Sequence, residues 1–92
     1  MTPSAQAPGP QATAKRWRDQ AGLHIDVRGL APPAPLVAIV RLIESIADAT
    51  PVIVHHDRDP VLLYAELAER GWVAETIAGE VGEVRLRLQS TR

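Results

Sequence analysis

Two short polar segments contain most of the side chains that could do chemistry in this chain. One spans residues 26–29 and the other spans residues 55–59. Together they offer carboxylates, imidazoles and guanidinium groups, which bind anions, hold metal ions or transfer protons. The candidate residues for binding a ligand or a protein partner are Asp26, Arg28, His55, His56, Asp57 and Arg58.

His55 and His56 are the first metal candidates, because imidazole is a common metal ligand. Adjacent residues of a strand point to opposite faces, so the two could share one ion only if the strand ends before them. Asp57, Asp59 and His24 could add ligands, but the chain has neither an HExxH motif nor a helical His-x-x-x-His spacing. We therefore favour one histidine packed at a strand end and the other in solvent. Binding of a metal or haem through His55 and His56 is the alternative.

Arg28 precedes Gly29, close to the expected start of a helix. A guanidinium at this place can clamp a carboxylate or a phosphate in bidentate fashion. We favour instead an ion pair with Asp57 or Asp59 that holds two loops together. Asp59 is followed by Pro60, and this pair is typical of a helix cap and a first helical residue.

The elements that position these residues follow from a regular pattern in residues 21–90. Alternating apolar residues predict strands at 23–27, 52–55, 72–77 and 83–89. Apolar residues at helical spacing predict one helix that starts near Pro35 and includes the stripe to Ala47, and a second at about 60–70. The order β-α-β-α-β-β predicts an α+β fold: a two-layer α/β sandwich with a four-stranded mixed sheet and two helices on one face. We expect the first three strands to be parallel and the last two to form a hairpin.

Two helices cover only one face of such a sheet. The residues expected on the other face are His24, Asp26, Arg85 and Arg87. A face of mixed charge is usually solvated, although its flatness also suits a docked partner. Tyr64 and Trp72 are expected in the core or at its edge, with their polar tips bonded.

The first part of the chain has a different composition. Residues 1–14 consist almost entirely of Ala, Pro, Gln, Thr, Ser and Gly, which predicts disorder. Residues 15–18, Lys-Arg-Trp-Arg, are interpreted as a linker whose Trp17 rests on the domain surface, with a docking arm for an acidic partner as the alternative. The predicted organisation is therefore a disordered tail and basic linker over residues 1–20 and a folded domain over residues 21–90.

Charge and composition exclude several classes of protein. The 92 residues include 11 acidic and 10 basic side chains, a balance that argues against nucleic-acid binding. The absence of cysteine excludes disulfides and thiolate sites. No membrane span or secretory signal is visible, so we expect a cytoplasmic protein, either a monomer or a weak homodimer.

Two segments carry a resemblance to a known family. His24-Ile-Asp-Val-Arg-Gly-Leu-Ala-Pro-Pro-Ala-Pro-Leu36 and His56-Asp-Arg-Asp-Pro-Val-Leu-Leu-Tyr-Ala-Glu-Leu-Ala-Glu-Arg-Gly-Trp72 resemble small bacterial domains of unknown function that are related to the TusA/SirA sulfur carriers. The resemblance covers about residues 22–89 and implies the TusA/SirA-like fold. Similar domains occur beside or fused to haemerythrin-like iron proteins and metal-cofactor assembly proteins, which implies a link to redox or metal metabolism.

The same resemblance implies that the carriers' activity is absent. Their Cys-Pro-x-Pro motif carries a persulfide at the start of the first helix, and the matching stretch here is Pro32-Pro33-Ala34-Pro35. Proline has no nucleophile, so sulfur transfer by that mechanism is impossible at Pro32. We therefore expect a non-catalytic accessory or interaction module without a cofactor, which binds a protein partner. An enzyme that uses Asp57 and a histidine as acid and base ranks last.

Overall fold

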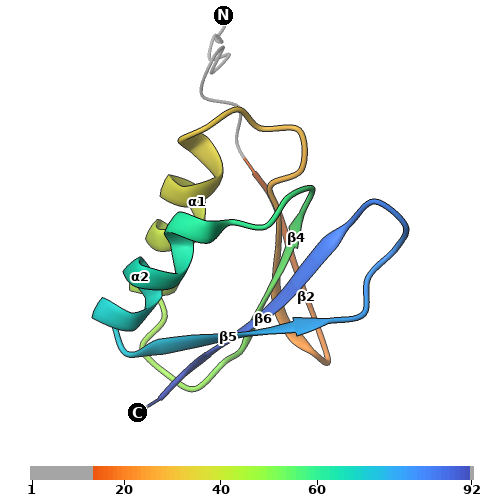
Figure 1. Ribbon diagram of the computed structural model, residues 1–92. Helices are drawn as coiled ribbons and strands as arrows, with labels where there is room; N and C mark the ends of the chain where they lie inside the picture. The colour runs from red at the N-terminus through yellow and green to blue at the C-terminus, as the bar shows by residue number, and fades with distance from the viewer. Residues whose placement is uncertain (1–13, 92) are drawn as a thin grey trace, which may run out of the picture.

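The computed structural model describes residues 14–91 and contains one sheet and two helices. The strands are β2 (Lys15–Asp19), β3 (Gly22–Asp26), β4 (Val52–His56), β5 (Trp72–Ile77) and β6 (Val84–Ser90). The helices are α1 (Ala34–Glu44) and α2 (Val61–Glu69). Both helices lie on the same face of the sheet, so the domain has two layers, as predicted (Figure 1).

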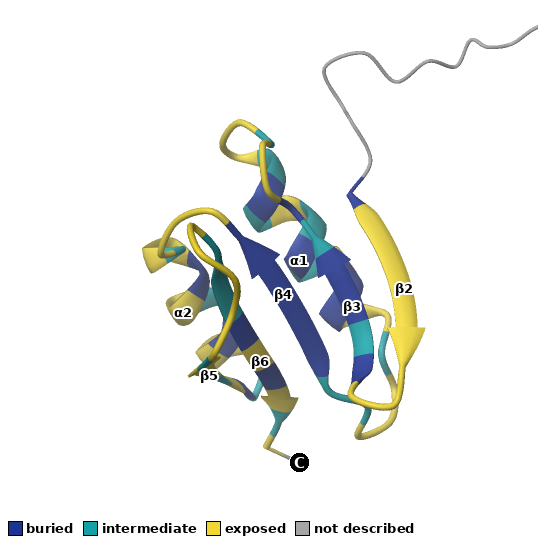
Figure 2. Cartoon of the chain, turned by 90° about the vertical axis from the view of Figure 1, so that its right-hand side faces the viewer, coloured by how far each residue is buried: buried dark blue, intermediate teal, exposed yellow. Residues whose placement is uncertain are grey.

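The sheet has one strand more than the sequence predicted. Its five strands follow the order β2-β3-β4-β6-β5, and β2 pairs antiparallel with β3 so that Trp17 lies opposite His24. The prediction of four strands was wrong because residues 15–19 contain a single apolar residue and were assigned to a linker. All five are exposed at the edge of the sheet (Figure 2), where a strand needs little apolar surface. Of residues 1–14, for which disorder was predicted, 1–13 lie outside the described residues. The prediction was wrong for Ala14, which is buried in the core cluster.

The strand directions agree with the prediction from the crossover helices. β3 pairs parallel with β4. β6 pairs antiparallel with both β4 and β5, so β3, β4 and β5 run in one direction. β5 and β6 form the predicted hairpin, and its second strand inserts between β4 and β5.

The core fills the space between the helices and one face of the sheet. Its fully buried residues include Ile25, Val27, Val52, Val54, Leu86 and Leu88 from the sheet side and Ile39, Ile43, Leu63 and Leu67 from the helices. Helix α1 has proline in its first turn, as predicted, but ends at Glu44 rather than near Ala47. The Ser45 hydroxyl donates to the Leu42 carbonyl at 2.6 Å and so competes with continuation of the helix. No helix within residues 14–91 has the length and apolar character needed to cross a membrane.

The close approach of two backbones at Gly22 gives a first prediction. Gly22 has a φ of +134°, and a Cβ there would overlap the carbonyl oxygen of Pro51. We expect Gly22→Ala to lower the free energy of unfolding by about 3 kcal/mol or more, because backbone strain and overlap act together. Gly29 is a matched control: its φ is +82°, but the space for a Cβ is open. Gly29→Ala should cost only about 1–2 kcal/mol in urea unfolding, and equal losses for the two variants would contradict the prediction.

Candidate functional site

Two histidines meet end to end on the sheet face that the helices leave uncovered. Nδ1 of His24, on β3, lies 2.8 Å from Nε2 of His55, on β4. The ring centroids are 5.1 Å apart, and the planes differ by 22°. A nitrogen lies roughly 1.1 Å from the centre of a five-membered ring with such bond lengths. These distances therefore place both nitrogens close to the line between the ring centres, so that they point directly at each other.

Each ring has a carboxylate at its far nitrogen. Nε2 of His24 donates to Oδ1 of Asp19 at 2.8 Å, and Nδ1 of His55 donates to Oε2 of Glu83 at 2.5 Å. The Asp19 side chain is 51% exposed, whereas that of Glu83 is 1% exposed. The four side chains form one hydrogen-bonded series, Asp19–His24–His55–Glu83, which we call the histidine chain.

Glu83 is the fixed end of the histidine chain. Its Oε1 accepts from the backbone N–H of Glu80 and from Nη2 of Arg85, both at 2.8 Å. Its Oε2 accepts from Nε of Arg85 at 3.1 Å in addition to His55. The Arg85 hydrogen bonds, followed by those from Glu80 and His55, lower the pKa of Glu83 to about 2. Gly79 leaves room for this carboxylate, since a Cβ there would lie 2.9 Å from Oε1.

Trp17 covers the two imidazoles. Its ring centroid is 4.9 Å from that of His24 and 5.1 Å from that of His55, and its plane lies within 12° of the His24 ring. His24 and His55 are consequently buried, with 7% and 6% exposure. The expectations of a solvated face at His24 and of one histidine in solvent were both wrong, because β2 places Trp17 over this part of the sheet.

His56 faces the opposite side of the sheet from His55. Strand β4 includes His56, so the alternation of side chains continues to the end of the strand. His56 is 3% exposed, and its Nδ1 accepts from the backbone N–H of Asp57 at 2.9 Å. The condition under which His55 and His56 could share an ion is therefore not met. Across residues 14–91, no three His, Cys, Asp or Glu side chains are grouped as metal ligands.

Arg28 forms its ion pair with Asp26 rather than with Asp57 or Asp59. Its Nε and Nη2 donate to the two Asp26 carboxylate oxygens at 2.9 and 2.8 Å, which lowers the pKa of Asp26. The predicted partner was wrong because Asp26, two residues away, lies within reach of both nitrogens. The loop after β3 and the loop after β4 are instead held together by Asp57, whose Oδ2 accepts from the backbone N–H of Gly29 at 3.0 Å.

Asp59 does not cap α2. The residue at the cap position is Pro60, and no side chain bonds to the first turn there. The Asp59 carboxylate accepts instead from the Tyr64 hydroxyl at 2.6 Å. Because this bond draws the carboxylate along the outside of the helix, the prediction of a cap was wrong. Tyr64 is more exposed than predicted, at 38%, whereas Trp72 is buried in the core.

An apolar groove of about 310 Å³ lies between the starts of α1 and α2. Its lining consists of Leu30, Pro32, Pro33, Pro35, Leu36, His56, Arg58, Asp59, Pro60, Val61, Leu62 and Leu63. Val61 and Leu62, in the first turn of α2, are 67% and 75% exposed. The six candidate residues thus separate into three places: His56 and Arg58 line the groove, His55 belongs to the histidine chain, and Asp26, Arg28 and Asp57 stabilise the loops between them.

Sequence reasoning missed three residues of this face: Trp17, Asp19 and Glu83. Two of them belong to β2, where the composition predicts a linker, and Glu83 lies in the turn before β6. The available signal was the spacing of Trp17 to Asp19 and of Glu83 to Arg85, since residues two apart in an extended segment share one face. That spacing shows only that the two residues of each pair share a face. It does not show whether this is the face covered by the helices or the uncovered face.

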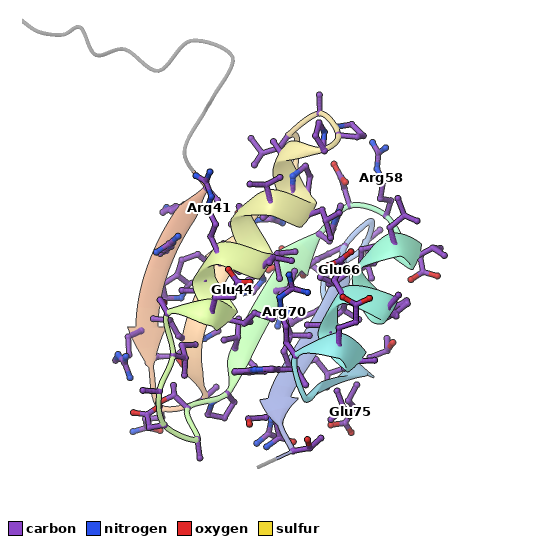
Figure 3. The ribbon with its side chains drawn as sticks, turned by 90° about the vertical axis from the view of Figure 1, so that its left-hand side faces the viewer. Arg41, Glu44, Arg58, Glu66, Arg70 and Glu75 are labelled. Atoms are coloured by element: carbon purple, nitrogen blue, oxygen red, sulfur yellow. The ribbon has the colours of Figure 1, made fainter. Side chains whose placement is uncertain are left out.

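A larger hollow, of about 460 Å³, lies at the ends of α1 and α2, away from the groove at their starts. Arg70 is the cation in its lining. Nε of Arg70 donates to Glu44 at 2.9 Å and Nη1 donates to Glu66 at 2.8 Å, so that its charge is balanced between the two helices (Figure 3). We therefore place the candidate binding surface at the apolar groove and treat this hollow as structural.

Fold and surface together define a small cysteine-free α/β sandwich with an apolar groove at the starts of both helices. A family model described as DUF2249, an uncharacterized conserved protein, matches residues 24–90. The chain therefore belongs to the DUF2249 family, which confirms the resemblance to a domain of unknown function. The comparison with curated proteins gives no match.

The depressed pKa of Glu83 gives a prediction for the pH dependence of stability. A carboxylate whose pKa falls from 4.5 to about 2 on folding contributes stability above pH 4.5, and this contribution is lost as the pH falls toward 2. We expect Glu83→Gln to lower the free energy of unfolding more at pH 7 than at pH 2.5, by about 2–3 kcal/mol. Urea unfolding at several pH values measures this difference. The exposed Glu75 is the control, and a pH-independent loss for Glu83→Gln would contradict the prediction.

Proposed function

We propose that this protein is a non-catalytic, TusA-like interaction module that binds a protein partner in the cytoplasm through the apolar groove. The observation that carries the proposal is the pair of exposed side chains at the groove, Val61 and Leu62. Large apolar side chains at a concave surface are typical of the central contacts in protein interfaces. The first turn of α2 does not need exposed apolar side chains for folding, because Val61 and Leu62 contribute little buried surface to the core.

The groove occupies the place where the resemblance implies a sulfur-carrying cysteine. Pro32 stands at that position, and both Pro32 and Pro33 line the groove. Proline supplies apolar surface but no thiol and no N–H donor. Helix α1 also begins without a side-chain cap, at Pro33. These features favour retention of the binding surface without the transfer reaction.

We infer that the occupant is a short apolar segment of the partner that ends in an acidic side chain. A volume of about 310 Å³ suits a few apolar side chains. Arg58 lines the same groove with a side chain that is 61% exposed, and its nearest carboxylate is 3.5 Å away, on Asp57. A partner carboxylate next to the apolar segment would therefore gain an ion pair. The resemblance to domains found beside iron and metal-cofactor proteins suggests a partner in redox or metal metabolism.

The runner-up functions have less support. Joint use of His55 and His56 for a metal or haem conflicts with their positions on opposite faces. An acid–base enzyme would need a free histidine beside Asp57. Oδ2 of Asp57 is bonded to Gly29, and both nitrogens of His55 are engaged in the histidine chain. Nδ1 of His56 lies 3.2 Å from Oδ1 of Asp57, but His56 is only 3% exposed and the same nitrogen accepts from the backbone N–H of Asp57.

The proposal predicts that one change in the groove abolishes binding. Wild type, Leu62→Asp and the control Val73→Asp are purified from the cells that produce the protein, and the co-purifying proteins are quantified. Val73 is also an exposed apolar residue, but it lies on β5, outside the groove. We expect at least one protein to be retained by wild type and by Val73→Asp and lost with Leu62→Asp.

The Kd of the identified partner then decides the question. Leu62→Asp should raise the Kd at least tenfold, which corresponds to about 1.4 kcal/mol. Val73→Asp should leave the Kd unchanged. A Kd that is insensitive to Leu62→Asp, or a sample in which no protein depends on Leu62, would contradict the proposal.

A further inference from the structure

The outer nitrogens of the histidine chain face carboxylates, whereas its inner nitrogens face each other. Nε2 of His24 and Nδ1 of His55 each face a carboxylate, which only accepts, so both nitrogens carry a proton. The two inner nitrogens then face each other at 2.8 Å. Two lone pairs repel at this distance, and two N–H groups would collide. A single hydrogen bond therefore joins the two inner nitrogens, with one of them as the donor and the other as the acceptor.

We infer that Cu⁺ binds between Nδ1 of His24 and Nε2 of His55, in place of the hydrogen bond that joins them. The displaced proton is released to solvent, and the outer N–H bonds to Asp19 and Glu83 stay unchanged. Cu⁺ accepts two ligands in line, and imidazole suits copper. The nearly collinear arrangement of the two nitrogens presents this ligand pair.

The same donor set disfavours Zn²⁺, which takes four ligands in structural sites. Within residues 14–91 the two imidazoles have no third His, Cys, Asp or Glu grouped with them as a ligand. The structure thus favours an ion that takes two nitrogen ligands.

The carboxylates act as the outer partners of the ligands. Histidines that bind metals usually donate the other ring N–H to a carboxylate or carbonyl, which fixes the tautomer and the orientation of the ring. Asp19 does this for His24, and Glu83 does it for His55. The two tautomers held in this way are those that leave the inner nitrogens free to bind Cu⁺.

Trp17 adds a third contact to the proposed ion. The centroids of Trp17, His24 and His55 form a nearly equilateral triangle with sides of 4.9, 5.1 and 5.1 Å. The middle of the His24–His55 line is therefore closer to the indole centre than either imidazole centre is. That point lies well within the ~6 Å over which an indole face attracts a cation, and the indole also keeps water from the site.

Binding requires a small opening of the pair. Metal–nitrogen bonds of about 2 Å place two ligands in line about 4 Å apart, so the inner nitrogens separate by about 1 Å. His55 is held by the buried, four-bonded Glu83, whereas His24 is bonded to the half-exposed Asp19 on the edge strand. We expect His24 and Asp19 to move and His55 to stay in place.

An anaerobic titration with Cu⁺ in competition with the chelator bicinchoninate tests the inference. We expect wild type to bind one Cu⁺ per chain, with quenching of Trp17 fluorescence. His24→Gln and His55→Gln should each lower the affinity at least 100-fold. His56→Gln is the matched control, because it removes a buried histidine from the opposite face of β4, and it should bind within threefold of wild type.

X-ray absorption of the loaded protein gives a readout that does not depend on these variants. We expect two nitrogen ligands and no sulfur, which distinguishes this site from binding by the thioether of Met1, the single methionine of the chain. Trp17→Phe should keep the stoichiometry and lose most of the quenching.

Three outcomes would overturn the inference: wild type that fails to compete with bicinchoninate, Cu⁺ retained by His24→Gln, or a sulfur ligand in the absorption spectrum. This test measures Cu⁺ binding, whereas the Leu62 experiment measures partner binding. Failure here therefore leaves the proposed partner binding untouched, and failure of the Leu62 experiment leaves the copper site untouched.

Discussion

A buried carboxylate requires a full set of donors, and the arrangement of this sheet follows from how Glu83 obtains them. The turn before β6 supplies a backbone N–H, β6 supplies the Arg85 guanidinium, and β4 supplies His55. Once Glu83 fixes the ring of His55, the inner nitrogen of that ring fixes His24, and His24 in turn reaches Asp19 on the edge strand. One series of hydrogen bonds thus joins the turn before β6 to β4, β3 and β2. Strand β2 has five exposed residues and gains little from apolar burial, so its attachment depends on its backbone pairing with β3, on Asp19 and on the stacking of Trp17.

The parts of the fold that rest on periodic patterns could be predicted from the sequence. Helical spacing gave α1 and α2, alternation gave four of the strands, and the crossover rule gave the direction of the first three of them. The failures have one physical origin, which is that polar contacts between side chains leave no periodic signal. Arg28 pairs with Asp26, two residues away, rather than with Asp57, and β2 is held by contacts that only the folded sheet creates. The sequence predicted which residues of the candidate site lie at the strand ends. It did not predict that His55 joins the uncovered face of the sheet while His56 lines the groove on the helix side.

That division gives β4 a double role. His55 points toward β2 and Trp17, and the adjacent His56 points toward the helices and lines the apolar groove. The two proposed sites therefore lie on opposite faces of one strand and share no side chain. A rigid strand of five buried residues separates them, so a ligand on one face reaches the other only through movement of β4 itself.

Strand β2 also determines how the sheet meets other copies of itself. It stands at one end of the strand order, where an edge can add a further strand from another molecule. Of its five residues, Lys15, Arg16 and Arg18 are cations. A second copy that approached edge to edge would bring two such rows of positive charge together in a sheet only about 5 Å from strand to strand. Growth of the sheet from molecule to molecule is therefore opposed at this edge by the same side chains whose composition predicted a linker.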